Sequence, residues 1–446
     1  MRKQITGSLA ATAALLAIAG IAQAAPAELN IYGASAQYTY WNAQAQHYAQ
    51  TKLGCTATAP VNNGGKHGFV AATACTSTLV PVNAATGKRD LDIRYSGIAS
   101  AEGVLAVKKA APLDATLAAG CNVANGERQM YASPSTTICK QVHVGTSDVA
   151  GESLIQASSG QKLGPMGGGA FSASVSAIDT ASLTPNNTVV VPFGFFINSA
   201  VTAQTCTAGL IGNYATAASQ CDTAPGKGDG LLGAAATITN ISREEASLIF
   251  SGYVSDWSDL GSYFTAQPVV ACLRHAGSGT HSALDLTVMN SSWGANIVAA
   301  EAAGSPTIWF NQGSGDEIKC INGNTTATPT GSLIGAIGYA DGDQALGVAA
   351  TSQNVKQLKY NGFYPTRTAI RNGLYDFYSN AWLYTNPANA AVVNAVAADL
   401  VLYAQDPANV PATKANYWAA QAEMKFNRGA ETAYPAFTGA SIPMLP

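Results

Sequence analysis

One arginine and several hydroxyl-bearing residues stand together in the segment RHAGSGTHS. The Arg274 guanidinium can donate hydrogen bonds to two oxygens of an oxyanion. Ser278 and Thr280 carry hydroxyl groups. Gly277 and Gly279 allow the backbone to come close to a ligand. No lysine follows the glycines, so the segment is not a phosphate-transfer loop. These residues predict a site that binds an anion, with no evident chemistry.

Such a site needs a strand that ends, and a helix that begins, at this turn. Residues 268–273 are an apolar, β-branched run typical of a buried strand, and residues 281–289 favour a helix. Backbone N–H groups and the positive end of the helix dipole would then face the turn. Alternatively, GSGT is only a flexible loop or a helix N-cap. The segment alone leaves both interpretations open.

The same order of strand, turn and helix occurs three more times upstream. These turns hold Ser35 with Ala36, Ser100, and Asp148, after strands predicted at residues 29–31, 91–95 and 141–144. An aspartate at such a turn is usually a helix cap. If the turns converge, however, the Asp148 carboxylate would repel any anion that carries no proton. It would therefore select phosphate over sulfate.

Residues 1–24 have the pattern of a secretory signal peptide. Arg2 and Lys3 precede the apolar run SLAATAALLAIAGIA, and the small-residue triplet AQA ends at Ala24. We expect cleavage near Ala24 and a periplasmic or secreted protein. A membrane anchor is the alternative, but the apolar run is short. No later stretch is long and apolar enough to span a bilayer.

The remaining chain of about 420 residues is too long for one ordinary core and predicts two lobes. We place lobe 1 at residues 25–195 plus 365–446 and lobe 2 at residues 196–364, with a buried strand at residues 189–200 crossing between them. Residues 407–446, with several prolines, predict a poorly structured tail. The net charge is −3 and no basic run exists, which excludes a nucleic-acid partner.

The eight cysteines are even in number, which in an exported chain argues for disulfides. Sequence order suggests Cys55 with Cys75, Cys121 with Cys139, Cys206 with Cys221, and Cys272 with Cys320, one connectivity among many. There is no C-x-x-C, and the five histidines are scattered, so we expect neither a metal nor a haem. We expect no other cofactor.

Two histidines, His275 and His281, flank the predicted site and suggest a catalytic alternative. The sequence has no G-x-S-x-G, no H-E-x-x-H and no carboxylate-rich metal cluster. We therefore expect a protein that is not an enzyme. His281 could add positive charge to the site at low pH. A secreted phosphatase-like hydrolase is the less favoured alternative.

Six blocks of sequence together resemble one protein family. They are IYGASAQYTYW, RYSGIASAEGV, VHVGTSDVAGES, ITNISREEASLIFSGYVSDWSDLG, LRHAGSGTHS and GAIGYAD. In this order they resemble periplasmic phosphate-binding proteins, the substrate-binding component of bacterial phosphate ABC importers. The resemblance implies an α/β fold of two lobes, each a mainly parallel sheet flanked by helices, with ligand in the cleft between them. Closure would be a hinge motion.

The resemblance also implies a role for each candidate residue. Ser35 and Ala36 would supply a turn hydroxyl and backbone amide, Ser100 the serine of the second turn, Asp148 the acceptor of a phosphate proton, Arg274 the cation, and Ser278, Gly279 and Thr280 hydroxyls and helix N-terminal amides. The implied partners are phosphate or a related oxyanion and the permease of an importer. We expect a monomer.

Several positions depart from the family pattern. Ala276 stands two residues after Arg274, where the family usually has an acid, so Arg274 would lack its neighbouring carboxylate. Glu102 replaces a glycine near Ser100, and its charge would weaken anion binding unless it points to solvent. Insertions at about residues 52–90, 115–140 and 200–235 lengthen the chain. These departures motivate a second hypothesis, an extracellular or surface interaction protein on the same fold with a drifted pocket.

Overall fold

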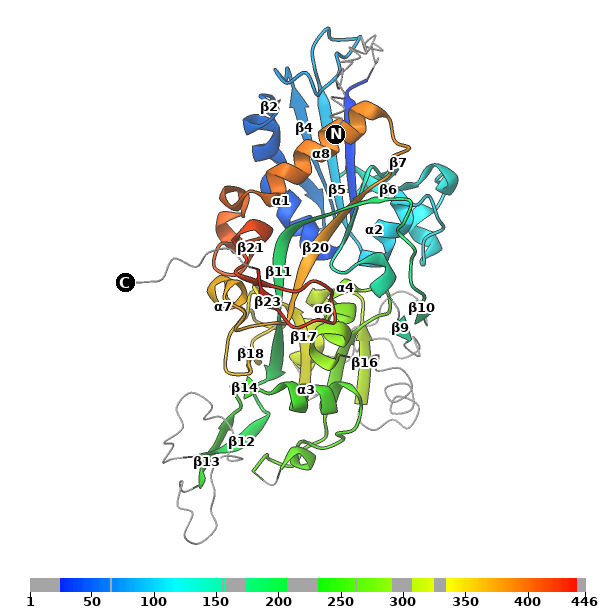
Figure 1. Ribbon diagram of the computed structural model, residues 1–446. Helices are drawn as coiled ribbons and strands as arrows, with labels where there is room; N and C mark the ends of the chain where they lie inside the picture. Colours follow the sequence, from blue (N-terminus) through cyan, green and yellow to red (C-terminus); the bar gives the residue numbers. More distant parts are fainter. Residues whose placement is uncertain are drawn as a thin grey trace, which may run out of the picture.

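One 13-stranded sheet runs through the molecule, with helices packed on it (Figure 1). The computed structural model describes residues 25–64, 66–154, 156–157, 174–206, 232–261, 263–290, 307–324 and 334–438. Along its main path the sheet has the order β16-β15-β17-β11-β20-β8-β1-β5-β4-β2. In Figure 1 the strands from β20 to β2 form an upper lobe, and β16, β15 and β17 form the sheet of a lower lobe.

The upper lobe is built around three parallel strands whose ends carry the predicted turns. They are β1 (Ala27–Gly33), β5 (Leu91–Gly97) and β8 (Val144–Ser147). Antiparallel strands β4 (His67–Thr73) and β20 (Tyr378–Thr385) flank them, and helices α1 (Ser35–Thr51), α2 (Ser100–Val107) and α8 (Ala391–Gln405) pack on the sheet. β1 and β5 alternate apolar and polar residues over much of their length, and their apolar side chains, such as Leu29, Ile31 and Ile93, are buried.

The lower lobe repeats this plan with a second parallel set. Strand β15 (Val270–Arg274) pairs in parallel with β16 (Thr307–Asn311) and β17 (Ala336–Asp341). Its helices are α3 (Arg243–Phe250), α4 (Gly279–Ala283) with its π-helical continuation Leu284–Met289, and α6 (Ser314–Ile321). The strand and the helix predicted around the GSGT turn are therefore confirmed, with the helix beginning two residues earlier than expected.

A single strand, β11 (Thr184–Asn198), crosses from one lobe to the other. Its first part pairs with β20 as far as Pro192, and its second part pairs with β17 from Phe193 onward. The crossing strand predicted at residues 189–200 is thus confirmed. The fold class predicted from the sequence, two α/β lobes, is confirmed as well, although both lobes also contain antiparallel strands. The lobe limits stay a prediction.

Two regions that the sequence left without predicted elements contain regular structure. The insertion at residues 52–90 includes β4, which joins the main sheet beside β5. The tail prediction is wrong as far as residue 438, because Trp418 is fully buried and β21 (Ala419–Ala420) pairs with β11. The prolines that suggested disorder lie in short turns, such as Pro407–Asn409, where the Asp406 side chain accepts the backbone N–H of Ala408.

Three of the predicted disulfides are confirmed. They are Cys55 with Cys75, Cys121 with Cys139 and Cys272 with Cys320. The predicted partner of Cys206, Cys221, lies outside the described residues. Such crosslinks are typical of proteins outside the reducing cytoplasm. No helix within the described ranges is long and apolar enough to cross a membrane.

Candidate anion site

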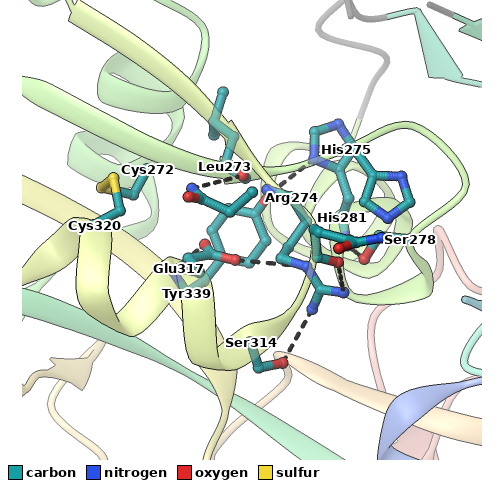
Figure 2. A network of polar contacts seen from close by, with 12 residues as sticks. Cys272, Leu273, Arg274, His275, Ser278, His281, Ser314, Glu317, Cys320 and Tyr339 are labelled. Carbon is teal, nitrogen blue, oxygen red and sulfur yellow. Dashed lines mark hydrogen bonds and ion pairs between the residues drawn. A yellow bond between two sulfur atoms is a disulfide. The ribbon is translucent and has the colours of Figure 1, made fainter. Parts of the chain in front are cut away.

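Arg274 is the last residue of β15, and its side chain is held rigidly. Its guanidinium donates to Ser314 Oγ and to the carbonyl of Gln312, each at 3.0 Å, and only 2% of the residue is exposed. Its backbone N–H donates to Tyr339 Oη at 3.1 Å. Figure 2 shows this network at the end of the strand. A buried guanidinium held in this way has a fixed direction.

The carboxylate missing at Ala276 is supplied from elsewhere. Glu317 of α6 is fully buried, and its Oε2 lies 3.9 Å from Arg274 Nε (Figure 2). Its Oε1 accepts the backbone N–H of Tyr339 at 3.0 Å. The expectation that Arg274 lacks a neighbouring carboxylate is therefore wrong. No motif pointed to Glu317, because it is distant in sequence and sits in the first turn of an ordinary amphipathic helix, SGDEIKCI.

Asp148 and Ser100 come together at the ends of β8 and β5. The Ser100 hydroxyl donates to Asp148 Oδ2 at 3.3 Å and accepts the Asp148 backbone N–H at 3.0 Å. Both residues are buried. The second carboxylate oxygen of Asp148, Oδ1, is buried without a hydrogen-bond partner among the described residues. Such an oxygen is costly to bury unless a ligand or water binds it.

The lower-lobe turn packs directly on these two upper-lobe residues. The carbonyl of Gly277 accepts the backbone N–H of Ala101 at 3.1 Å. A Cβ placed on Gly279 would lie 2.2 Å from Ser100 Oγ and 2.6 Å from Asp148 Cβ, which no real side chain could tolerate. Glycine is therefore required at 279 by the close approach of the two lobes. Three of the four predicted turns are brought together.

Ser278 and Thr280 are buried at the start of α4. Ser278 is the N-cap of this helix, and its hydroxyl accepts from the backbone N–H of His281 at 3.5 Å. The helix-cap interpretation of this segment is thus confirmed. It is compatible with an anion site, because a cap residue lies where the remaining helix N–H groups face outward.

The first turn lies at the same edge of the sheet but is less directly involved. Ser35 opens α1, and its Cα would lie 3.1 Å from a Cβ placed on Gly97 at the end of β5. Ala36 is buried in the helix. Within the described part of the chain, Ser35 has no hydrogen bond to Ser100, Asp148 or Arg274. A ligand role for Ser35 and Ala36 stays a prediction.

Three buried carboxyl groups, those of Asp148, Glu317 and Asp341, interact electrostatically with Arg274. Burial, with Asp341 nearby, raises the pKa of Asp148 to about 7, although Arg274 and the Ser100 hydrogen bond oppose the shift. Burial, with Asp343 nearby, raises the pKa of Asp341 to about 6, and burial raises the pKa of Glu317 well above its usual range. Near neutral pH the site therefore holds exchangeable protons beside a fixed positive charge. Asp341 ends the block GAIGYAD, so a signal for it was present.

Glu102 neither enters this cluster nor points to solvent. It is buried, and its Oε1 accepts the backbone N–H groups of Leu113 at 2.7 Å and Asp114 at 3.3 Å. Burial raises its pKa to about 7, although Arg128 nearby favours the charged form. The carboxyl group thus fastens the loop after α2.

His281 does not bring positive charge to the site. Its Nδ1 lies 2.7 Å from Tyr339 Oη, and burial lowers the pKa of the imidazole well below its usual range. The ring is therefore neutral near neutral pH, and added charge from it requires a pH well below the usual pKa of histidine. Among the described residues, no group of His, Cys, Asp and Glu is arranged to hold a metal ion.

Two lobes joined by the crossing strand β11 meet where the turn at Gly277 and Gly279 packs on Ser100 and Asp148. The chain has a two-lobed α/β fold. No family model matches the sequence, and no curated protein matches it significantly.

Several solved structures are similar to the chain at low identity. A phosphate transport receptor from Vibrio cholerae is 12% identical, with a TM-score of 0.40, over 85% of this chain and 94% of that one. A substrate-binding protein from Clostridium perfringens with bound phosphate is 12% identical, with a TM-score of 0.41, over 84% and 92%. The periplasmic phosphate-binding protein PfluDING is 14% identical, with a TM-score of 0.42, over 89% and 92%.

Proposed function

We propose that the protein is an exported solute-binding protein that holds inorganic phosphate, or a similar oxyanion, between its lobes. The observation that carries this proposal is the meeting of the Arg274 turn with Ser100 and Asp148. These residues come from both lobes and supply a cation, a hydroxyl and a proton acceptor. An anion bound among them would be enclosed on both sides, so binding and lobe closure would be coupled.

The chemistry of Asp148 favours an oxyanion that shares a proton. When Asp148 is ionised, a protonated phosphate oxygen can donate to its Oδ1. When Asp148 is protonated, the carboxyl group can donate to the anion instead. In both cases one proton lies between the two groups, whereas sulfate has none to share at neutral pH. The site would therefore prefer phosphate above pH 7 and admit sulfate as the pH falls below it.

The surrounding features support a role in import. The signal-peptide pattern and the disulfides suit a periplasmic or secreted protein. We propose that it works as a monomer and passes its ligand to the permease of an ABC importer. The alternative of an interaction protein with a drifted pocket loses its two main reasons, because Glu317 replaces the missing acid and Glu102 is occupied by backbone N–H groups.

Calorimetry of the purified mature protein, stripped of ligand, tests the proposal. We expect saturable phosphate binding at pH 8 that Arg274→Ala and Asp148→Asn both weaken strongly. Lys52→Ala and Asp179→Asn remove the same charges from exposed positions and serve as matched controls. The absence of any phosphate heat in correctly folded wild-type protein would overturn the proposal.

A further inference from the structure

The C-terminal segment of residues 424–438 forms a strap, here called the latch, across the middle of the molecule. Its two short strands, β22 (Phe426–Asn427) and β23 (Ala436–Phe437), pair with each other and close a loop. In Figure 1 this red segment passes in front of the level where the upper and lower lobes meet. The loop carries three side chains that contact three different parts of the fold.

The first contact fastens the latch to the upper-lobe half of the anion site. Glu431 Oε1 accepts the backbone N–H of Ala150 at 2.5 Å and the indole N–H of Trp382 at 3.0 Å. Ala150 lies two residues after Asp148, at the end of the same turn. Glu431 is also one of the charges that act on the Asp148 carboxyl group. The latch therefore helps to position the Asp148 turn.

The second contact is at the point where the chain crosses between the lobes. The Arg428 guanidinium is buried, donates to the carbonyl of Asp376 and lies 4.0 Å from the centre of the Tyr378 ring. Tyr378 pairs with Pro192 of β11, immediately before that strand enters the lower lobe. Arg428 thus packs on β20 beside the point where β11 crosses between the lobes, where any hinge rotation would occur.

The third contact reaches the lower lobe. The ring of Tyr434 lies 4.9 Å from the guanidinium of Arg243, the first residue of α3. Arg243 donates to the carbonyls of Thr287 and Val288, each at 2.7 Å, at the end of the helix that begins at the anion turn, and it pairs with Asp376. One guanidinium therefore joins the latch to the helix of the lower-lobe half of the site.

We propose that the latch opposes separation of the two lobes, with Glu431 as a positioning residue toward the upper lobe and Tyr434 as one toward the lower lobe. The inference rests on the proposed function only where it concerns phosphate. Opening the hinge would pull Arg243 away from Tyr434 while Glu431 stays with the Asp148 turn. The latch would consequently slow ligand release and shift the ligand-free protein toward the closed arrangement.

Tyr434→Ala separates this role from a structural one. The tyrosine is 62% exposed, so its removal should leave the fold intact. We expect phosphate to dissociate about twofold to fivefold faster in stopped-flow measurements, the range for one exposed cation–π contact. The radius of gyration of the ligand-free variant should rise in small-angle X-ray scattering. Tyr253→Ala, at an exposed tyrosine outside the latch, is the matched control and should change neither the release rate nor the radius of gyration.

Glu431 is tested with a conservative pair of variants. Glu431→Ala loses both acceptor contacts and should release phosphate faster, whereas Glu431→Gln keeps an acceptor oxygen and should restore the slower rate. If the wild-type protein bound no phosphate, the proposed function would fail while scattering still tested the latch. Two results together would overturn the latch proposal. They are scattering curves for Tyr434→Ala that coincide with those of the wild type, and an unchanged rate of phosphate release where release is measurable.

Discussion

The two halves of the anion site are held in contrasting ways. On the lower-lobe side, Arg274 is fixed by hydrogen bonds, by the Glu317 carboxylate and by the disulfide between Cys272 of its own strand and Cys320 of the helix that carries Glu317. On the upper-lobe side, Asp148 is held by Ser100 and by hydrogen bonds that are not covalently secured. The comparison shows a crosslinked half that carries the cation, here called the rigid half, and a half held by hydrogen bonds without a crosslink, here called the adjustable half.

The largest expected effect comes from breaking the rigid half. Arg274→Ala removes the cation that acts on all three buried carboxyl groups, those of Asp148, Glu317 and Asp341. Phosphate affinity should fall on the order of 100-fold or more, because a charge-assisted bidentate contact is lost. Stability should fall by about 3–5 kcal/mol at pH 8, as when one partner of a buried ion pair is removed. Calorimetry and chemical denaturation measure the two losses; a small change in affinity would contradict this account.

The adjustable half is broken by Asp148→Asn. Phosphate affinity at pH 8 should fall about 10-fold to 100-fold, because a hydrogen bond to a charged acceptor is lost. Sulfate, which the carboxylate repels, should gain affinity in the same variant. Titration with both anions measures this exchange of preference. A parallel loss for phosphate and sulfate would show that Asp148 does not discriminate by proton.

The Asp148 carboxyl group also makes the stability of the ligand-free protein depend on pH. This stability falls as the pH rises, whereas the preference for phosphate over sulfate increases. The folded-state pKa of Asp148 is raised from 3.8 to about 7, so the folded protein keeps a proton that the unfolded chain loses between about pH 4 and 7. Ligand-free stability from this group should therefore fall as the pH rises through that window. In thermal unfolding, Asp148→Asn should lose less stability than wild type between pH 5 and 8. Parallel curves would argue against the buried, proton-bearing carboxyl group.

Removal of the disulfide between Cys272 and Cys320 tests the same comparison and should have a smaller effect on phosphate binding. Replacing Cys272 and Cys320 together by alanine should cost about 2–4 kcal/mol of stability. It should also weaken phosphate binding several-fold, because Arg274 and Glu317 would no longer be tied to each other through their strand and helix. Replacing Cys121 and Cys139 is the matched control, expected to lower stability but not affinity. Equal affinities in both double variants would show that the Cys272 crosslink has no part in positioning.

The smallest expected effect is that of Glu102→Gln. The glutamine oxygen can still accept the N–H groups of Leu113 and Asp114, so phosphate affinity should change less than about twofold. Because burial raises the pKa of Glu102 to about 7, the variant should be slightly more stable than wild type above that pH. A marked gain in phosphate affinity would place the Glu102 charge in the site after all.

Local sequence patterns predicted the elements that present the site, and long-range contacts account for what they missed. Arg274 ends an apolar run, Ser100 and Asp148 follow short strands rich in alternating residues, and parallel strands carry their ends to one edge of a sheet, so short segments were sufficient. Glu317 lies near Arg274 because β15 pairs with β17 and α6 packs on both strands. No local sequence pattern encodes these contacts. The latch was missed because its buried residues, such as Met424 and Arg428, are few and lie in a short segment without an apolar run.

The crossing strand also bears on how the molecule unfolds. The hydrogen-bond ladder of β11 is shared, with β20 on one side of Pro192 and β17 on the other, so neither lobe has a complete sheet without it. Loss of this strand removes a central partner from both sheets at once. We therefore expect denaturant to produce one cooperative transition over the whole chain, with a slope set by the combined surface of both lobes.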